Sequence, residues 1–271
     1  MKRLLFFPWL LAVCLSARAE DVFLKDGKVV RAQGLRREGN FLFVRTVNAE
    51  GVGSEALLQF SQVERIAFGD PPAMVEARKL ANAGNAAAVL EKTASLVPST
   101  RLFADVPGNL WADLVRLRLP AIAILKDRDA LSELQKQWVV TGDADLEEAL
   151  KLVVESQAAG DSKASLQRWK SVAVPGATSL TAGLAWLELG KAALEAKQWK
   201  EAVRAFLSVE VFVANYRILH PPALLGAIRA FVSSGELKDA KIRMEVLQAE
   251  FPNSAELRLA AELMPLPPVK K

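Results

Sequence analysis

The pattern of hydrophobic and polar positions divides the chain into two parts that meet near residue 70. Residues 21–69 carry short runs rich in Val, Phe and Ile, separated by polar turns such as Asp26-Gly27, as expected for strands joined by hairpins. From Ala73 onward the chain predicts helices with breaks between them. Asp70-Pro71-Pro72 marks the boundary, because proline fixes φ and the residue before it avoids the helical region. The pattern therefore predicts an α+β fold, with strands first and helices after them.

The first part predicts a small β module over residues 20–70. Five short strands are expected, at 22–24, 29–33, 41–47, 56–60 and 63–68, with a polar turn at 36–40 and a glycine-containing loop at 48–54. So few strands leave two edges open unless the sheet closes on itself. A small five-stranded barrel is therefore the expected arrangement.

The two ends of this module resemble a known family. Val22-x-Leu24-Lys25-Asp26-Gly27 is similar to the opening of Sm-like and SH3-like barrels, and Val63–Phe68 is similar to the last strand of secreted barrels of that class. Sm-like proteins often bind RNA, but residues 20–70 hold seven basic and eight acidic residues. Phosphate binding needs clustered positive charge, so no nucleic acid partner is expected. A polymer-binding barrel stays open as an alternative, and it would need a basic or aromatic stripe on these strands.

Residues 1–19 have the order of a secretory signal peptide. Two basic residues precede the uncharged apolar run Leu4–Leu15, and Ala17-Arg18-Ala19 supplies a small-residue cleavage site. The run is too short for a membrane-spanning helix, which needs about 20 residues. We therefore expect cleavage before Glu20 and an exported protein, periplasmic or extracellular, that does not span the membrane.

Cys14 offers a second interpretation of the same segment. Leu11-Ala12-Val13-Cys14 resembles the box at which bacterial lipoproteins are cleaved and acylated, but Val13 departs from the small residue that this box requires, so a lipid anchor is not expected. Cys14 is the one cysteine of the chain, so a protein cleaved before Glu20 has no disulfides. Cleavage also removes three basic residues, which leaves 32 basic against 31 acidic residues and a nearly neutral body. Residues 265–271 are expected to form a flexible tail rich in Pro and Lys.

The second part, residues 71–264, predicts a series of helices. They are expected at 73–83, 86–97, 109–126, 129–140, 144–158, 162–173, 179–196, 199–214, 222–234, 237–250 and 254–264. Pro98–Gly108 is the longest break, and Pro120 is a point at which the third helix could kink or split.

Small residues near the start of every second helix recur along this part. Ala88, Ala130, Ser165, Ala202 and Ala240 are spaced by 35 to 42 residues, which is the period of helix-turn-helix repeats. A helical hairpin cannot bury its apolar face alone, so successive hairpins are expected to stack into an α-solenoid.

The last two copies carry a more specific pattern. Trp186-x2-Leu189-Gly190 followed by Ala202-x3-Phe206 resembles the tetratricopeptide repeat, and the next copy has Phe231, Gly235, Ala240, Met244 and Pro252 at matching offsets. Ala193, Ala214, Leu224 and Ile228 stand where the family has other residues. The resemblance implies that these residues pack helix pairs together and that the concave face of the solenoid binds a peptide or a partner helix. Phe251-Pro252-Asn253-Ser254 is similar to repeat ends in tetratricopeptide proteins of the bacterial cell envelope.

Most tryptophans of the helical part are expected to pack inside it. Trp169 and Trp199 are the two candidates for contact with a partner, because each stands beside a lysine and therefore on a partly polar helix surface.

Candidate chemistry in the sequence is sparse. His220 is the single histidine and is expected in a loop, where it has no evident partner for general-base work and, without cysteines, cannot form a structural zinc site. Tyr216, also unique, is expected to pack at a loop or helix end. The acidic run Asp143–Glu148 could bind Ca²⁺, but it lacks the glycine turn and glutamate spacing of an EF-hand and suits the first turn of a helix capped by Asp143. No catalytic residue, cofactor or metal is therefore predicted.

These observations predict an exported interaction scaffold of a cell-envelope complex rather than an enzyme. A carboxylate-based glycan hydrolase of the envelope is the alternative, because two acidic residues that meet only in space leave no local sequence pattern.

Overall fold

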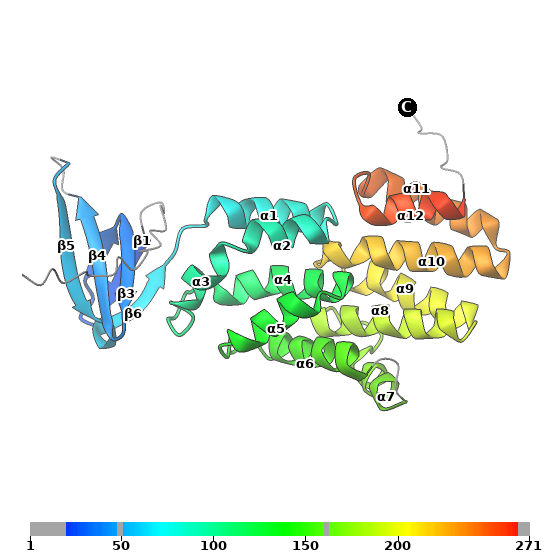
Figure 1. The fold of residues 1–271 in the computed structure, drawn as a ribbon, viewed down its shortest axis with the longest axis horizontal. Coiled ribbons are helices and arrows are strands. Elements are labelled where there is room, and N and C mark those ends of the chain that lie inside the picture. The colour runs from blue at the N-terminus through cyan, green and yellow to red at the C-terminus, as the bar shows by residue number, and fades with distance from the viewer. Residues whose placement is uncertain (1–19, 48–50, 160–162, 265–271) are drawn as a thin grey trace, which may run out of the picture. The chain divides into compact units, whose positions relative to one another are not determined.

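The computed structural model of the chain describes residues 20–47, 51–159 and 163–264. The expected signal peptide, the lipid site at Cys14 and the tail at 265–271 lie outside these residues. Strands come first and helices follow, as the sequence predicts (Figure 1). The chain divides into two compact units, here called the β unit and the helical unit. The β unit comprises the chain up to Pro71 together with Pro98–Leu110, and the helical unit comprises Pro72–Val97 and the chain from Trp111 onward.

The described residues of the β unit form six strands in two antiparallel sheets of three, whereas five strands were expected. The strands are β1 Glu20–Leu24, β2 Val29–Ala32, β3 Gly34–Glu38, β4 Phe41–Val47, β5 Gly53–Gln59 and β6 Val63–Ala67, with a short 3-10 turn, η1, at Phe60–Gln62. The order is β2-β1-β6 in one sheet and β3-β4-β5 in the other.

The additional strand is β3, which the sequence assigns mostly to a turn. It pairs with β4 from Gly34 opposite Arg45 to Glu38 opposite Phe41. Only Leu35 of this strand points into the core, so its polar residues hide the alternation that marks a half-buried strand. The turn itself is short, and Gly39 takes the positive φ of 54° that it needs.

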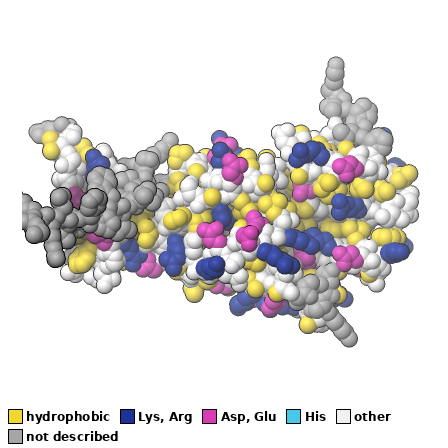
Figure 2. Space-filling model, viewed as in Figure 1, with side chains coloured by type: hydrophobic (Ala, Val, Ile, Leu, Met, Phe, Trp, Pro, Cys, Tyr) yellow, Lys and Arg dark blue, Asp and Glu magenta, His cyan; other side chains and the backbone are white. Residues whose placement is uncertain are grey.

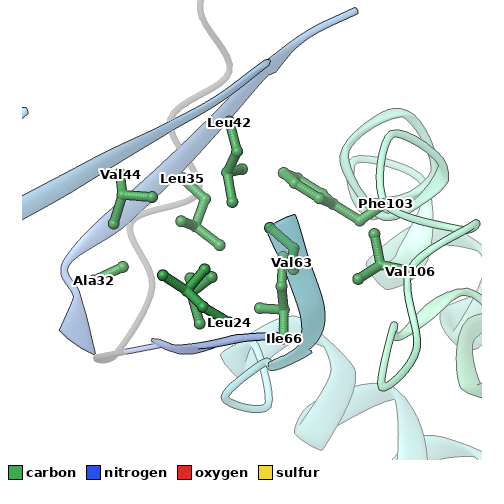
Figure 3. Close-up of a cluster of buried hydrophobic side chains, with 10 residues drawn as sticks. Leu24, Ala32, Leu35, Leu42, Val44, Val63, Ile66, Phe103 and Val106 are labelled. Carbon is green, nitrogen blue, oxygen red and sulfur yellow. The ribbon is translucent and has the colours of Figure 1, made fainter. Parts of the chain in front are cut away.

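The core of the β unit is completed by a segment from further along the chain. Inward side chains of the strands, among them Val22, Leu42 and Ile66, form one buried cluster with Phe103 and Val106 (Figure 3). Phe103 is 3% exposed and Val106 is 2% exposed. The sequence boundary at residue 70 leaves this segment out of the β module. Because so short a chain buries only a modest share of its surface, these two side chains are a substantial part of its core.

Polar contacts fix the same segment to the strands. The guanidinium of Arg37 in β3 donates to the carbonyl of Leu102 at 2.7 Å and to Oδ2 of Asp105 at 2.9 Å. This ion pair lowers the pKa of Asp105. The amide of Ile66 in β6 donates to the carbonyl of Pro107 at 3.2 Å, so the segment covers part of the free edge of β6.

The helical unit consists of helices packed as consecutive pairs. Their bounds are α1 Pro72–Asn82, α2 Ala86–Thr93, α4 Trp111–Leu125, α5 Arg128–Lys136, α6 Ala144–Ala159, α7 Lys163–Val172, α8 Leu180–Glu195, α9 Trp199–Phe212, α10 His220–Ser234, α11 Leu237–Glu250 and α12 Ala255–Leu263. A short 3-10 turn, η2, covers Arg217–Leu219. The closest packing is between α8 and α9, α9 and α10, and α10 and α11, and α8 also contacts α6. The chain therefore stacks hairpin on hairpin in sequence order.

Several helix boundaries differ from those expected; the helix expected at 129–140, for example, covers Arg128–Lys136. The helix expected at 86–97 ends at Thr93, and a further short helix, α3 Leu96–Arg101, begins near the end of that expected range and extends into the expected break. Pro120 lies inside α4 without splitting it, because Leu119, Ala121 and Ile122 around it are all buried and hold the helix in place. His220 is the first residue of α10 and not a loop residue.

The first hairpin of the helical unit also contacts the last ones. Gly84, in the turn after α1, lies against Pro221 and Phe251 with a φ of 73°, so a side chain there would overlap the Pro221 ring. Nearby, Arg217 donates to the carbonyl of Asn82 at 3.4 Å and pairs with Glu250 at 3.1 Å. The stack is therefore closed by contacts between segments more than 100 residues apart.

Candidate functional site

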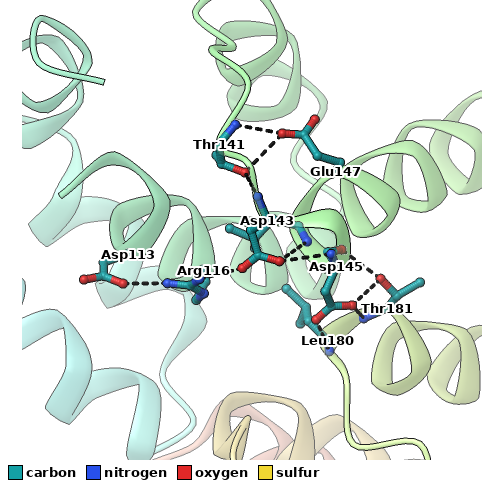
Figure 4. Close-up of polar contacts among 9 residues, drawn as sticks. Asp113, Arg116, Thr141, Asp143, Asp145, Glu147, Leu180 and Thr181 are labelled. Carbon is teal, nitrogen blue, oxygen red and sulfur yellow. Dashed lines mark hydrogen bonds and ion pairs between the residues drawn. The ribbon is translucent and has the colours of Figure 1, made fainter. Parts of the chain in front are cut away.

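The acidic run Asp143–Glu148 is engaged in helix capping and ion pairs (Figure 4). Oδ1 of Asp143 accepts hydrogen bonds from the amides of Asp145 at 3.0 Å and Leu146 at 3.3 Å, which confirms the predicted cap of α6. Its other oxygen pairs with Arg116 of α4, and these bonds lower the pKa of Asp143 against the opposing effect of burial.

The next acidic side chains join neighbouring elements. Asp145 accepts from the amides of Leu180 at 2.8 Å and Thr181 at 3.1 Å and from the Thr181 hydroxyl at 2.6 Å, so it caps α8 from α6. Glu147 accepts from the Thr141 amide at 2.8 Å. Within residues 20–47, 51–159 and 163–264, no three His, Cys, Asp or Glu side chains gather in a way that could hold a metal ion.

The residues of the predicted repeat pattern lie at three kinds of position. Ala202, Ala240 and Met244 are fully buried, Phe206 is 2% exposed and Phe231 is 8% exposed. Trp186 and Leu189 of α8 are half-buried. Gly235 and Pro252 are exposed, and Gly235 ends α10 with a φ of 84°, the left-handed conformation typical of a helix C-terminus.

Phe206 contacts two glycines, of which the sequence identifies one. A Cβ added to Gly190 of α8 would lie 2.6 Å from the Phe206 ring, as the predicted pattern requires. A Cβ added to Gly226 of α10 would lie 2.4 Å from the same ring, so it would overlap the ring as well. A glycine inside a helix destabilises it by about 1 kcal/mol relative to alanine. A glycine in the middle of the helix expected at 222–234 was therefore the signal in the sequence that another group packs closely against Gly226.

The two tryptophans expected to contact a partner lie differently. Trp169 of α7 is 1% exposed, so its ring packs inside the helical unit. The expected contact of Trp169 with a partner is therefore wrong. Trp199 is the first residue of α9 and is half-buried. Their neighbours Lys170 and Gln198 line a hollow of about 580 Å³ between α7, α8 and α9, which also exposes part of Trp186.

The unique histidine and tyrosine both pack against the protein. His220 is 6% exposed, its Nε2 lies 3.3 Å from the carbonyl of Val213, and burial lowers its pKa. Tyr216 is half-buried, and burial raises its pKa. It lines a hollow of about 300 Å³ with Arg116 and Arg217, whose charges are met by carboxylates. This hollow therefore presents no unopposed charge of the kind that selects an ion.

Two adjoining hollows together form a candidate site, here called the inner groove. The first, of about 380 Å³, lies among α4, α5, α6 and α8, and the second, of about 220 Å³, lies among α4, α8, α9, α10 and α12. They share Ala123 of α4 and Leu184 and Glu188 of α8. The inner groove is therefore built mostly by the first helices of successive pairs, which the sequence pattern alone does not place together.

The inner groove combines aliphatic and charged side chains. Its basic residues are Lys126, Arg128, Lys191 and Arg229, and its acidic residues are Glu188 and Glu256. Lys191 pairs with Glu188 at 2.6 Å. Burial raises the pKa of Glu256, which favours its neutral form. Basic charge thus exceeds acidic charge along the groove.

Gln157 of α6 is the most unusual lining residue. Its amide Nε2 and Oε1 are both buried, and neither has a hydrogen-bond partner among the residues that the structure describes. Buried polar atoms are paired in the great majority of cases, so an amide with both ends unpaired requires an explanation.

On the face drawn in Figure 2, basic and acidic side chains lie among each other over the helical unit, with hydrophobic side chains between them. No helix in the described part of the chain is long and apolar enough to cross a membrane. Comparisons with protein-family models, with curated proteins and with solved structures found no match.

Proposed function

We propose that the protein is an exported interaction scaffold that binds a segment of a partner protein in the inner groove of its helical unit. The observation that carries this proposal is the groove itself, which runs across α4, α6, α8, α10 and α12. Stacked helix pairs commonly present such extended surfaces to a partner chain. The tetratricopeptide-like residues Gly190, Ala202 and Phe206, which pack α8 against α9, support the same interpretation.

The β unit supplies a second contact surface in this proposal. Phe41 of β4 and Leu57 of β5 are 44% and 57% exposed, and both lie in the sheet β3-β4-β5, of which β5 is one of the two edge strands. Exposed apolar side chains near a free strand edge favour contact with another protein.

The alternative is a carboxylate-based glycan hydrolase, and one observation favours it. Glu188 and Glu256 line the same hollow, and burial raises the pKa of Glu256 in the direction that a general acid needs. The ion pair of Glu188 with Lys191 holds that carboxylate in a structural contact, which favours binding over catalysis. A Glu256→Gln variant separates the two: a hydrolase loses glycan cleavage, whereas a scaffold retains its partner.

Site-specific photo-crosslinking in intact cells tests the proposal. A photoreactive phenylalanine analogue replaces Arg229 or Ser156, which line the groove, or Lys238, which is exposed on α11. We expect the two groove positions to capture the same partner chain and Lys238 to capture none. Equal capture from all three positions, or capture from Lys238 alone, would contradict the proposal.

A further inference from the structure

We infer that the segment bound in the inner groove is acidic and extended, and that the amide of Gln157 holds its backbone. This inference rests on the proposed function and specifies the chemistry of the partner. It is drawn from two independent features of the groove, the unpaired amide and the unopposed basic side chains.

The unpaired amide matches the polar groups of a peptide. Gln157 lines the first hollow, and its buried Nε2 and Oε1 offer one donor and one acceptor side by side. In an extended chain the N–H and C=O of one residue point to the same side, as they do toward a neighbouring strand. A single primary amide can therefore pair with both. Solvent does not reach either atom in the free protein, so a bound peptide would satisfy them once the Gln157 side chain turns into the hollow.

The basic side chains of the groove determine which sign of charge the partner segment should carry. Lys126, Arg128 and Arg229 line the groove, and none of them pairs with a carboxylate in the described part of the chain. The nearest polar contact of Arg128 is a long one, 3.5 Å, to the backbone carbonyl of Gln157. Complementary charge steers association and selects partners, so these cations favour an acidic segment.

Other occupants fit less well. The chain's own residues 265–271 carry two lysines and no acidic residue, so their charge opposes that of the groove. The aliphatic floor, formed by Leu152, Leu184 and Leu225, gives any occupant apolar contact but does not select among sequences. Charge and the free amide are the selective features.

Fluorescence anisotropy with two short labelled peptides tests the inference on the purified protein. One peptide alternates Glu and Ala, and its match alternates Lys and Ala. We expect the Glu peptide to bind, to lose affinity steeply as salt is added, and to bind at least about tenfold more tightly than the Lys peptide. Preference for the Lys peptide, or equal binding of both, would overturn the assignment of charge.

Two variants test the residues directly. Gln157→Met removes the hydrogen-bonding atoms at similar volume, so it should lower the affinity for the Glu peptide about tenfold. It should also raise the midpoint of thermal unfolding, because no polar atom of that side chain is then left buried and unpaired. Arg229→Glu should lower the affinity for the Glu peptide and raise the affinity for the Lys peptide. Gln198→Met and Lys238→Glu, at exposed positions away from the groove, are the matched controls and should change neither affinity.

The outcomes separate this inference from the function on which it rests. If Gln157→Met lowers the unfolding midpoint and leaves affinity unchanged, the amide has a structural role and the inference is wrong. If neither peptide binds while the groove positions still crosslink to a partner, the scaffold stands and the acidic segment does not. Sedimentation showing a dimer that Arg229→Glu dissociates would assign the groove to a second copy of this chain and overturn the inference.

Discussion

The ring of Phe206 in α9 lies directly against the backbone of Gly226 in α10, so closely that a Cβ at Gly226 would overlap it. The same ring faces Gly190 of α8. One aromatic side chain therefore joins three helices, and it can do so because two of them have no side chain at the contact.

Gly226→Ala tests this contact. Alanine normally stabilises a helix relative to glycine by about 1 kcal/mol, but here we expect a loss of about 1–3 kcal/mol because the core is overpacked. The free energy of unfolding from urea titration is the measurement. Adding Phe206→Leu should recover part of the loss, while Ser233→Ala, at an exposed position of α10, should be nearly neutral. A stabilised Gly226→Ala protein would show that the helices are further apart than described.

Arg37→Ala tests the attachment of the segment 98–110 to the β unit. The variant loses hydrogen bonds to the carbonyl of Leu102 and to Asp105, and contacts of this charged kind contribute about 1.5–3 kcal/mol. We expect faster proteolysis within 98–110 and a lower free energy of unfolding of the β unit. Arg31→Ala, whose side chain is 79% exposed and makes one long contact with Asp21, is the control and should be nearly silent.

Asp145→Ala tests the cap that joins α6 to α8. The carboxylate accepts from two amides and one hydroxyl at the start of α8, so its loss leaves several donors unpaired. We expect a loss of about 1–3 kcal/mol in the free energy of unfolding. Asp129→Ala is the matched control, since Asp129 is also acidic and in a first helical turn but is exposed. Equal effects of the two variants would contradict the capping role of Asp145.

Glu20 makes the stability of the β unit depend on pH. Burial raises its pKa from 4.5 to about 7, and Oε2 has no hydrogen-bond partner within residues 20–47, 51–159 and 163–264. The folded state therefore binds more protons than the unfolded state between these two values, and stability should fall as pH rises from about 4.5 to about 7. Urea midpoints measured across this window check the sign. Glu20→Gln should flatten the profile, whereas Glu64→Gln, at an exposed position of β6, should leave it unchanged.

Local patterns predicted much of the secondary structure. The helix expected at 237–250 has those bounds in the structure, and the Asp26-Gly27 turn joins β1 to β2 with a positive φ at Gly27. The cap at Asp143 was also predictable. In each case a few neighbouring residues determine the outcome, through helical periodicity, backbone freedom or a side chain that bonds its own helix.

What the sequence did not reveal depends on residues far apart in the chain. Phe103 looks like an apolar residue in a long break, and only the folded chain brings it to the core of the β unit. The need for a glycine at position 226 is explained only by the ring of Phe206, which lies against it in the folded chain. The inner groove has the same character, because Gln157 is an ordinary helix residue until the surrounding helices bury its amide without bonding it.

The discontinuity of the β unit has a consequence for synthesis. Ribosomes deliver the chain from its N-terminus, so all six strands emerge before Phe103 and Val106 exist to cover them. During that interval the edge of β6 has unpaired backbone groups, and such edges pair with other nascent chains. Chains stalled before residue 98 should consequently aggregate, whereas chains released after residue 110 should not.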